Sequence, residues 1–336
     1  MVERCPGARP GEPATIAAEA RRGAIRRPAS LAAWALIWRA TVADRPALAG
    51  LMFVIAVVLV SVAAPVFSPY DPTVPVSGSR LAPPFTPGHP FGIDSQQRDV
   101  LARLLWGGRI SLLAGIVPTA AATLVSLALG TVAAHTGGVV ETVVMRGMDI
   151  LFAFPSALLA IAIAGTLGPT EQNQMLAIGI VLIPYITRVV HDSVRSVAVL
   201  PYVEASRSVG ASTRRMLVRH VVPNAFPPVL AYSTTLVGMM MVLSSGLSFL
   251  GLGVQPPTAD WGAMVRDAKD VLSVAPWLST LPGLLILLTA LAFNYLGDGL
   301  SDALDPRRRR LKAAGALGTH RWAGAGGTDQ AHARPA

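Results

Sequence analysis

The chain has 336 residues, of which 52% are hydrophobic and only 14% are charged. Soluble domains carry about 25% charged residues, so this deficit argues against a soluble protein and favours an integral membrane protein. The net charge of +9 does not indicate a nucleic-acid partner, because aromatic residues are sparse and the basic residues gather at the termini and in one connection. A single cysteine, Cys5, excludes internal disulfides and a thiolate metal cage.

The chain divides into an arm, a membrane domain and a tail. Residues 1–46 are rich in Arg, Pro and Ala without an apolar core, which predicts a largely disordered cytoplasmic arm rather than a signal peptide. A short helix over 31–43 is expected to lie on the membrane. Residues 47–304 contain six stretches that approach the roughly 20 apolar residues needed to span a bilayer. These predicted spans are 47–64, 110–134, 150–168, 173–190, a stretch within 226–254, and one centred on 281–296. Residues 305–336 form a basic tail that is expected to be disordered.

The distribution of basic residues sets the orientation of these spans. With both termini in the cytoplasm, 22 of the 28 Lys and Arg residues lie on the inside. Because basic residues are retained on the cytoplasmic side of a membrane, this arrangement is favoured over its inverse. The chain is therefore predicted to be an all-α, multi-pass protein of the inner (plasma) membrane, with six transmembrane helices and both termini cytoplasmic.

The cytoplasmic connection 195–226 holds an Arg-rich module with the pattern of a helix, a turn and a second helix. Helical periodicity predicts that the fourth span continues to about Ser208, and Gly210 suits the left-handed position that follows a helix end. Ser212 is placed to cap the second helix, which Pro223 is expected to end. The module is thus predicted to be two short helices joined by a glycine corner.

Glu204 is the lone acid among the arginines of this module. Glu204 can pair with Arg207 or Arg195 on a solvated face, or it can contact a partner protein that binds at the corner. The arginines themselves can serve as membrane-surface anchors. Small side chains at Ala205 and Ser206 leave the corner open to the approach of another protein.

These residues resemble the EAA loop of ABC-importer membrane subunits, which has the pattern E-A-A-x3-G-x9-I-x-L-P. The positions that carry the match are Glu204, Ala205, Ser206, Gly210 and Pro223. The chain departs from the pattern where Ser206 replaces an alanine and where His220 and Val222 stand at the Ile and Leu positions.

The resemblance extends over about residues 47–308 to the dipeptide/oligopeptide/nickel permease family, and to its C-type subunit in particular. The stretches that carry it are HPFGIDSQQRDVLARLLWGGRISLLAG (89–115), MDILFAFPSALLA (148–160), LSFLGLGVQPPTADWGAMV (247–265) and APWLSTLPGLLILLTALAFNYLGDGLSDALDPR (275–307). Residues 95–97, SQQ, stand where relatives usually carry an acidic residue, Leu and Gly, so this outer turn is expected to differ.

The resemblance implies the fold of type I ABC-importer permeases, the MetI-like fold, and one half of a pathway for di- or oligopeptides or a related solute such as nickel. The chain has no G-x4-G-K-[ST] loop, so ATP must be hydrolysed by another subunit, and no catalytic site, cofactor or metal is expected. The implied partners are a homologous second permease subunit in a heterodimer, cytoplasmic ABC ATPase subunits and an extracytoplasmic solute-binding protein. In this picture the five EAA-loop residues transmit ATPase motion to the spans they continue.

The fifth span offers hydroxyl side chains that could line the translocation pathway. They are Ser233, Thr234, Thr235, Ser244, Ser245 and Ser248. Small polar residues also let membrane helices pack closely, so both interpretations stay open.

Three alternatives differ from this prediction in class. An ion-coupled secondary transporter would need intramembrane ionisable residues and broken helices, and Pro118 and Pro184 are candidate breaks without a buried charge beside them. Asp149 lies near a span end within reach of Arg146 and is expected to be an anchor. A membrane enzyme lacks a metal-ligand spacing such as HExxH. A structural scaffold leaves the glycine corner without a role.

Overall fold

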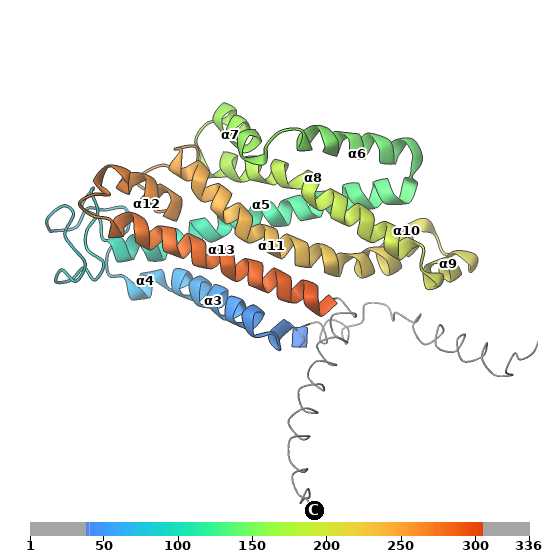
Figure 1. Cartoon of the computed structure of the whole chain (residues 1–336), viewed down its shortest axis with the longest axis horizontal. Helices are drawn as coiled ribbons and strands as arrows, with labels where there is room; N and C mark the ends of the chain where they lie inside the picture. Colours follow the sequence, from blue (N-terminus) through green and yellow to red (C-terminus); the bar gives the residue numbers. More distant parts are fainter. Residues whose placement is uncertain (1–37, 40, 305–336) are drawn as a thin grey trace, which may run out of the picture.

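The computed structural model describes residues 38, 39 and 41–304, so the predictions for the tail 305–336 and for most of the arm 1–46 and the surface helix 31–43 lie outside them. The helices form an elongated bundle, with the outer loops and α12 at one end and α9 and α10 at the other (Figure 1). Their bounds are α3 Arg45–Val62, α4 Ala64–Phe67, α5 Val100–Thr136, α6 Gly138–Phe152, α7 Ser156–Leu167, α8 Glu171–Ala198, α9 Pro201–Ser208, α10 Thr213–Met216, the π-helical turn η1 Leu217–Val221, α11 Val222–Phe249, α12 Trp261–Ala268, the 3₁₀ turn η2 Lys269–Val271 and α13 Trp277–Leu304.

Five helical segments of the described residues are long and apolar enough to cross a membrane, and one bent pair raises the number to six. The five are α3, α5, α8, α13 and the continuous stretch Thr213–Phe249, and they coincide with the predicted spans other than the third, except that α3 ends two residues before the predicted 64. Pro118 and Pro184 lie inside α5 and α8 without interrupting either helix. The two candidate breaks considered for a secondary transporter are therefore ordinary helical positions.

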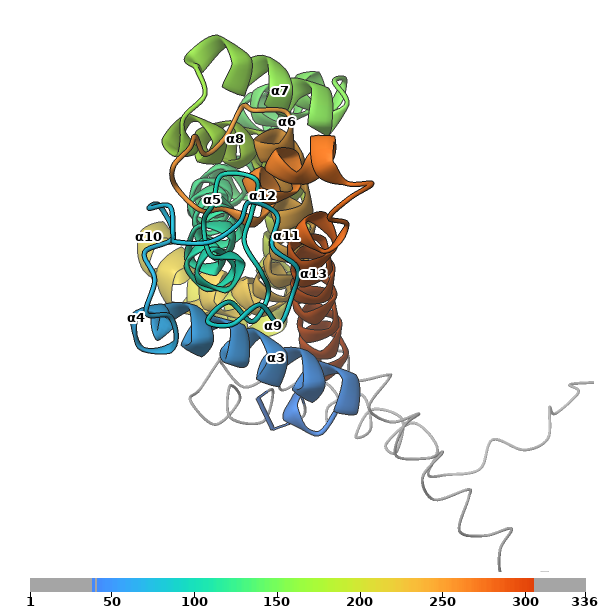
Figure 2. The same ribbon diagram turned by 90° about the vertical axis from the view of Figure 1, so that its left-hand side faces the viewer.

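The predicted third span, 150–168, is not one helix. The chain breaks at 153–155, and α6 and α7 meet there at 88°. Pro155 explains the break, because it has no N–H to donate to the preceding turn and it disfavours helical geometry in the residue before it. As a result α6 runs along α8, whereas α7 is turned across the bundle (Figures 1 and 2).

Glycines bring the long helices into close contact. Gly50 of α3 faces the Ala292 carbonyl of α13, and Gly238 of α11 faces the Ala290 carbonyl; a Cβ at either glycine would lie 2.5 Å from that oxygen. In the same way Gly130 of α5 lies against α8. Small residues at such crossings let membrane helices gain van der Waals contact that lipid cannot supply.

Replacing Gly238 by Ala is expected to destabilise the bundle by about 1 to 3 kcal/mol, because the new methyl group forces α11 and α13 apart. Thermal unfolding of the purified protein measures the loss. Gly283→Ala in α13 is the matched control, since a Cβ there meets no atom within 4 Å. Equal unfolding midpoints for the two variants would contradict this account of the α11–α13 contact.

A buried ion cluster fixes the outer loop to α5 and α12. The Asp94 carboxylate accepts bonds from Arg98 Nε at 2.9 Å and from Arg103 Nη1 at 2.6 Å. Asp267 of α12 accepts from the same two arginines at 3.3 and 3.2 Å. Both arginines are only 2% exposed. Two acids thus pair with two fully buried guanidinium groups away from water, which such charges require, and Arg266 also reaches Asp267 at 3.4 Å.

The turn at 95–97 contains a residue in the left-handed conformation although it has no glycine. Gln97 has φ 60°, a region that costs free energy for a residue with a side chain. Asp94 Oδ1 offsets this by accepting the backbone N–H groups of Gln96 and Arg98, both at 2.8 Å.

Candidate coupling site

Pro201 separates α9 from the fourth span. Helix α8 ends at Ala198, and Leu200 is extended, with φ −75° and ψ 141°. Because the residue before a proline is disfavoured in helical geometry, the chain turns there and α9 begins at Pro201. The prediction that the helix of the fourth span continues to about Ser208 is wrong for this reason.

The module is anchored to the bundle by one face and exposed on the other. Val203 of α9 and Met216 of α10 are 1% and 3% exposed and pack into the same hydrophobic cluster as Val194 and Val221. On the opposite side, Val209 is 89% exposed beside the glycine corner. An apolar side chain left in solvent at a helix end is suited to burial against another protein.

Gly210 forms the predicted corner. Its φ is +83°, and a Cβ placed on it meets no atom within 4 Å. Ala211 N donates to Ser206 O at 3.2 Å and Gly210 N donates to Arg207 O at 3.0 Å, the two bonds of a Schellman helix end. Backbone conformation, rather than crowding within this chain, is therefore what favours glycine here.

Pro223 does not end the second helix, contrary to the prediction. The helix continues from Thr213 to Phe249, and Pro223 stands at the start of α11. The turn before it widens into the π-helix Leu217–Val221, in which Val222 N donates to Leu217 O. In a π turn the carbonyl with which the proline ring would clash is displaced. The helix therefore continues through Pro223 with a changed hydrogen-bond pattern. Ser212 does precede this helix, but its side chain makes no capping bond.

Glu204 lies exposed in the first turn of α9. Among the described residues it makes no ion pair, and Arg195 instead donates to Glu141 at 2.9 Å. The alternative in which Glu204 pairs with Arg195 or Arg207 is therefore not realised.

Helix α6 is tied to α8 beside this module by ion pairs that the sequence analysis did not identify. Glu141 accepts from His191 Nε2 and Arg195 Nη1, both at 2.9 Å. Nearer the break, Asp149 accepts from Arg188 Nη2 at 2.6 Å and from Arg146 at 3.4 Å. The prediction of an Asp149 anchor thus holds, with Arg188 as its closer partner. Glu141 and His191 are 50 positions apart, and no local pattern signals their contact.

Comparison with known proteins decides the class of the chain. Residues 126–310 match the family model described as the binding-protein-dependent transport system inner membrane component. The chain belongs to this permease family. Residues 33–84 of the permease also match the N-terminal TM domain of oligopeptide transport permease C.

Relatives of this permease are similar to it over nearly their whole length. The glutathione transport system permease protein GsiD of Pectobacterium atrosepticum is 38% identical over 274 residues, covering 82% of this chain and 91% of its own. The di/tripeptide transport system permease protein DppC of Pseudomonas aeruginosa is 39% identical, covering 80% and 91%. Among solved structures, a chain of the inward-facing MetNI methionine ABC transporter has a TM-score of 0.49 and 18% identity, covering 60% of this chain and 97% of its own.

Family membership confirms the predicted C-type permease and excludes the three alternatives. The permease is a multi-pass inner membrane protein and a non-catalytic subunit of an ABC importer. Membership also implies ATPase subunits and a binding protein as partners.

The hydroxyl residues of α11 make contacts that fit helix packing. Ser233 bonds Thr123 of α5 at 3.0 Å. Ser244 and Ser248 accept from Gln174 Nε2 of α8, at 2.9 and 3.2 Å. The other three hydroxyls, those of Thr234, Thr235 and Ser245, donate to carbonyls of their own helix. Gln174, which is fully buried, was not singled out from the sequence, although a polar side chain inside a span usually bonds across helices.

Proposed function

We propose that this permease imports a short peptide, of the size of a dipeptide, a tripeptide or glutathione, in an importer driven by ATP hydrolysis on its partner subunits. The observation that carries the proposal is its likeness to relatives named for di/tripeptide and glutathione transport, which extends over 91% of their length. Such solutes share a peptide bond and a free carboxylate, and they differ from a bare nickel ion in both size and charge.

Uptake by the assembled transporter in vesicles tests this function. With its ATPases and binding protein present, we expect ATP-dependent uptake of dialanine, trialanine or glutathione. Uptake that follows an ion gradient and ignores ATP would overturn the importer mechanism. ATP-dependent uptake of nickel without any peptide would overturn the substrate class and leave the mechanism standing.

The proposal gives the glycine-cornered module the role of receiving ATPase motion. The residues concerned are Glu204, Ala205, Ser206, Gly210 and Pro223. The support is physical: the corner is exposed, its rear face is anchored by Val203 and Met216, and α9 stands between two long helices. A push on α9 therefore reaches α8 on one side and, through the π turn, α11 on the other.

Replacing Glu204 by Ala is expected to lower ATP-dependent uptake about tenfold, because an exposed charge at a protein interface loses its partner. ATP-driven uptake by vesicles with equal permease content measures the effect. Asp298→Ala is the control, since Asp298 is an exposed acid near the cytoplasmic end of α13 and lies outside the corner. Equal uptake by wild type and Glu204→Ala would remove Glu204 from the coupling role.

The second permease subunit of the proposed heterodimer would meet the exposed stripe of α11. Thr235, Met239, Val242 and Gly246 follow one another at spacings of four, three and four residues, so they lie on one helix face. Met239 and Val242 are both 52% exposed. Of the six hydroxyl residues predicted to line the pathway, Thr235 is the one on this face. It is half-buried, with its hydroxyl near Gly297 of α13, and we propose it as the pathway residue among them.

A cysteine at Thr235 tests that placement. In a background where Cys5, the single native cysteine, is replaced by Ser, Thr235→Cys should react with a bulky charged thiol reagent and lose uptake. Leu124→Cys on α5, where the native side chain is 69% exposed, is the control and should keep its uptake after the same treatment. Uptake through Thr235→Cys that survives the reagent would exclude this residue from the pathway.

A further inference from the structure

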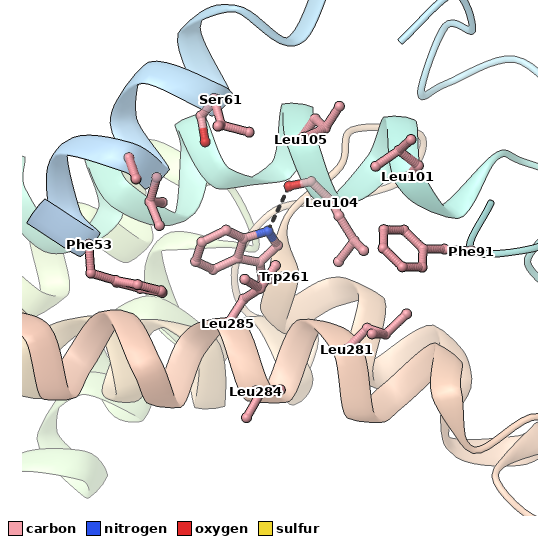
Figure 3. Close-up of a pocket in the computed structure, with 13 residues that line it drawn as sticks. Phe53, Ser61, Phe91, Leu101, Leu104, Leu105, Trp261, Leu281, Leu284 and Leu285 are labelled. Atoms are coloured by element: carbon pink, nitrogen blue, oxygen red, sulfur yellow. Dashed lines mark hydrogen bonds between the residues drawn. The ribbon is translucent and has the colours of Figure 1, made fainter. Parts of the chain in front are cut away.

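An apolar groove lies between α3, α5 and α13. Helix α3 starts against α13, where Gly50 faces the Ala292 carbonyl, and ends against α5, where Ser61 lies on Gly108. Helix α3 crosses from one helix to the other, and an apolar pocket lies between the three (Figure 3). The pocket is a cavity of about 320 Å³ that is open to the side.

The walls of the groove suit a hydrocarbon chain. Phe53, Val57 and Leu284 are among its lining residues, and Ser61 is the only lining residue with a hydroxyl or charged group. Trp261 forms the floor, and its indole Nε1 is already bonded to the Leu104 carbonyl at 2.9 Å (Figure 3). A peptide would leave its polar groups without partners here, so the groove is not suited to the transported solute.

Arg109 stands at the end of the groove marked by Ser61. Its Nε and Nη2 atoms donate to the carbonyls of Ser61 and Val62, both at 2.7 Å, and its guanidinium lies 4.3 Å from the Trp106 ring. Within the described part of the chain no carboxylate pairs with Arg109. A guanidinium group in a membrane helix that has no carboxylate partner is stabilised by another anion. The anionic group at the membrane surface is the phosphate of the lipid headgroup.

We propose that this groove binds one acyl chain of an outer-leaflet phospholipid, whose phosphate binds Arg109. The apolar groove matches the acyl chain of the lipid, and Arg109 matches its phosphate. Arg109 and Trp106 lie where α3 reaches its outer end, and both residue types are found at membrane interfaces. From Ser61 the groove follows α3 inward to Phe53, which is the direction of an acyl chain.

Two variants of the full transporter test each half of the site separately. Ala56→Phe places a ring inside the groove, whereas Arg109→Gln removes the charge. In native mass spectrometry of the complex purified from membranes, we expect wild type to retain phospholipid and each variant to retain about tenfold less. Ala121→Phe on the exposed face of α5 is the matched control and should retain lipid as wild type does.

Labelling identifies the occupant directly. In nanodiscs containing phosphatidylglycerol with a photoreactive acyl chain, we expect cross-links to the groove residues of α3 and α13, and their loss in Ala56→Phe. Equal lipid retention by all variants, together with cross-links confined to other faces, would overturn the proposal. Cross-links from an Ala56→Cys probe to a helix of the partner permease would also overturn it, because the groove would then hold protein.

Discussion

Replacing Asp94 by Asn is expected to lower the free energy of unfolding by about 3 to 5 kcal/mol, because it leaves two buried guanidinium groups with one acid. Asn keeps the Oδ1 atom that accepts the backbone N–H groups of Gln96 and Arg98, so the change isolates the ion pairs. Denaturant-induced unfolding of the purified permease in mixed micelles measures the loss. Asp267→Asn should behave alike, since Asp267 accepts from the same two arginines.

The control for this substitution is an exposed acid in the same loop. Asp71 bonds only its neighbour Thr73, and both lie in solvent. Asp71→Asn should therefore leave stability unchanged. If Asp94→Asn unfolded with the same midpoint as Asp71→Asn, the ion cluster would not be what holds the outer loop on α5 and α12.

Replacing Gly210 by Val is expected to abolish most transport while the transporter stays assembled. A β-branched residue at φ +83° costs about 1 to 3 kcal/mol, so the helix end must change and the two Schellman bonds are lost. We expect ATP-dependent uptake to fall at least about tenfold. Uptake per assembled complex, together with its rate of ATP hydrolysis, measures the effect.

Gly147→Val supplies the matched control for the corner. Gly147 lies in α6, and a Cβ on it also meets no atom within 4 Å, but its φ is not in the left-handed region. Gly210→Asn is expected to keep more transport than Gly210→Val, because Asn tolerates the left-handed region better. Unchanged uptake in Gly210→Val would show that the corner does not couple the ATPase to the spans.

Hydropathy predicted the membrane helices well because burial in lipid demands long apolar runs. Five of the six predicted spans coincide with long helices of the described chain. The third failed because an apolar run reports only composition, and a chain that turns by 88° at Pro155 has the same composition as a straight one. The proline itself was the local signal for this break.

The Arg-rich module of residues 195–226 shows which structural features local sequence patterns can predict and which they cannot. Gly210 was predicted correctly because a left-handed helix end depends on one residue and its backbone. Pro223 was mispredicted because a π turn, set up over Leu217–Val221, lets the helix continue into a proline. Glu141 and His191 could not be paired from the sequence at all, since only the packing of α6 on α8 brings them together.

The two ion-pair sites between α6 and α8 have a mechanical consequence. Glu141 and Asp149 are eight residues apart on one helix, and so their attachments to α8 are separated by about 12 Å. One ion-pair site alone would let α6 rotate relative to α8. Two sites at that separation fix the orientation of α6 along α8. Any rocking of α8 then carries α6 with it as one rigid unit, and α7, which also packs on α8, lies beyond the bend at 153–155.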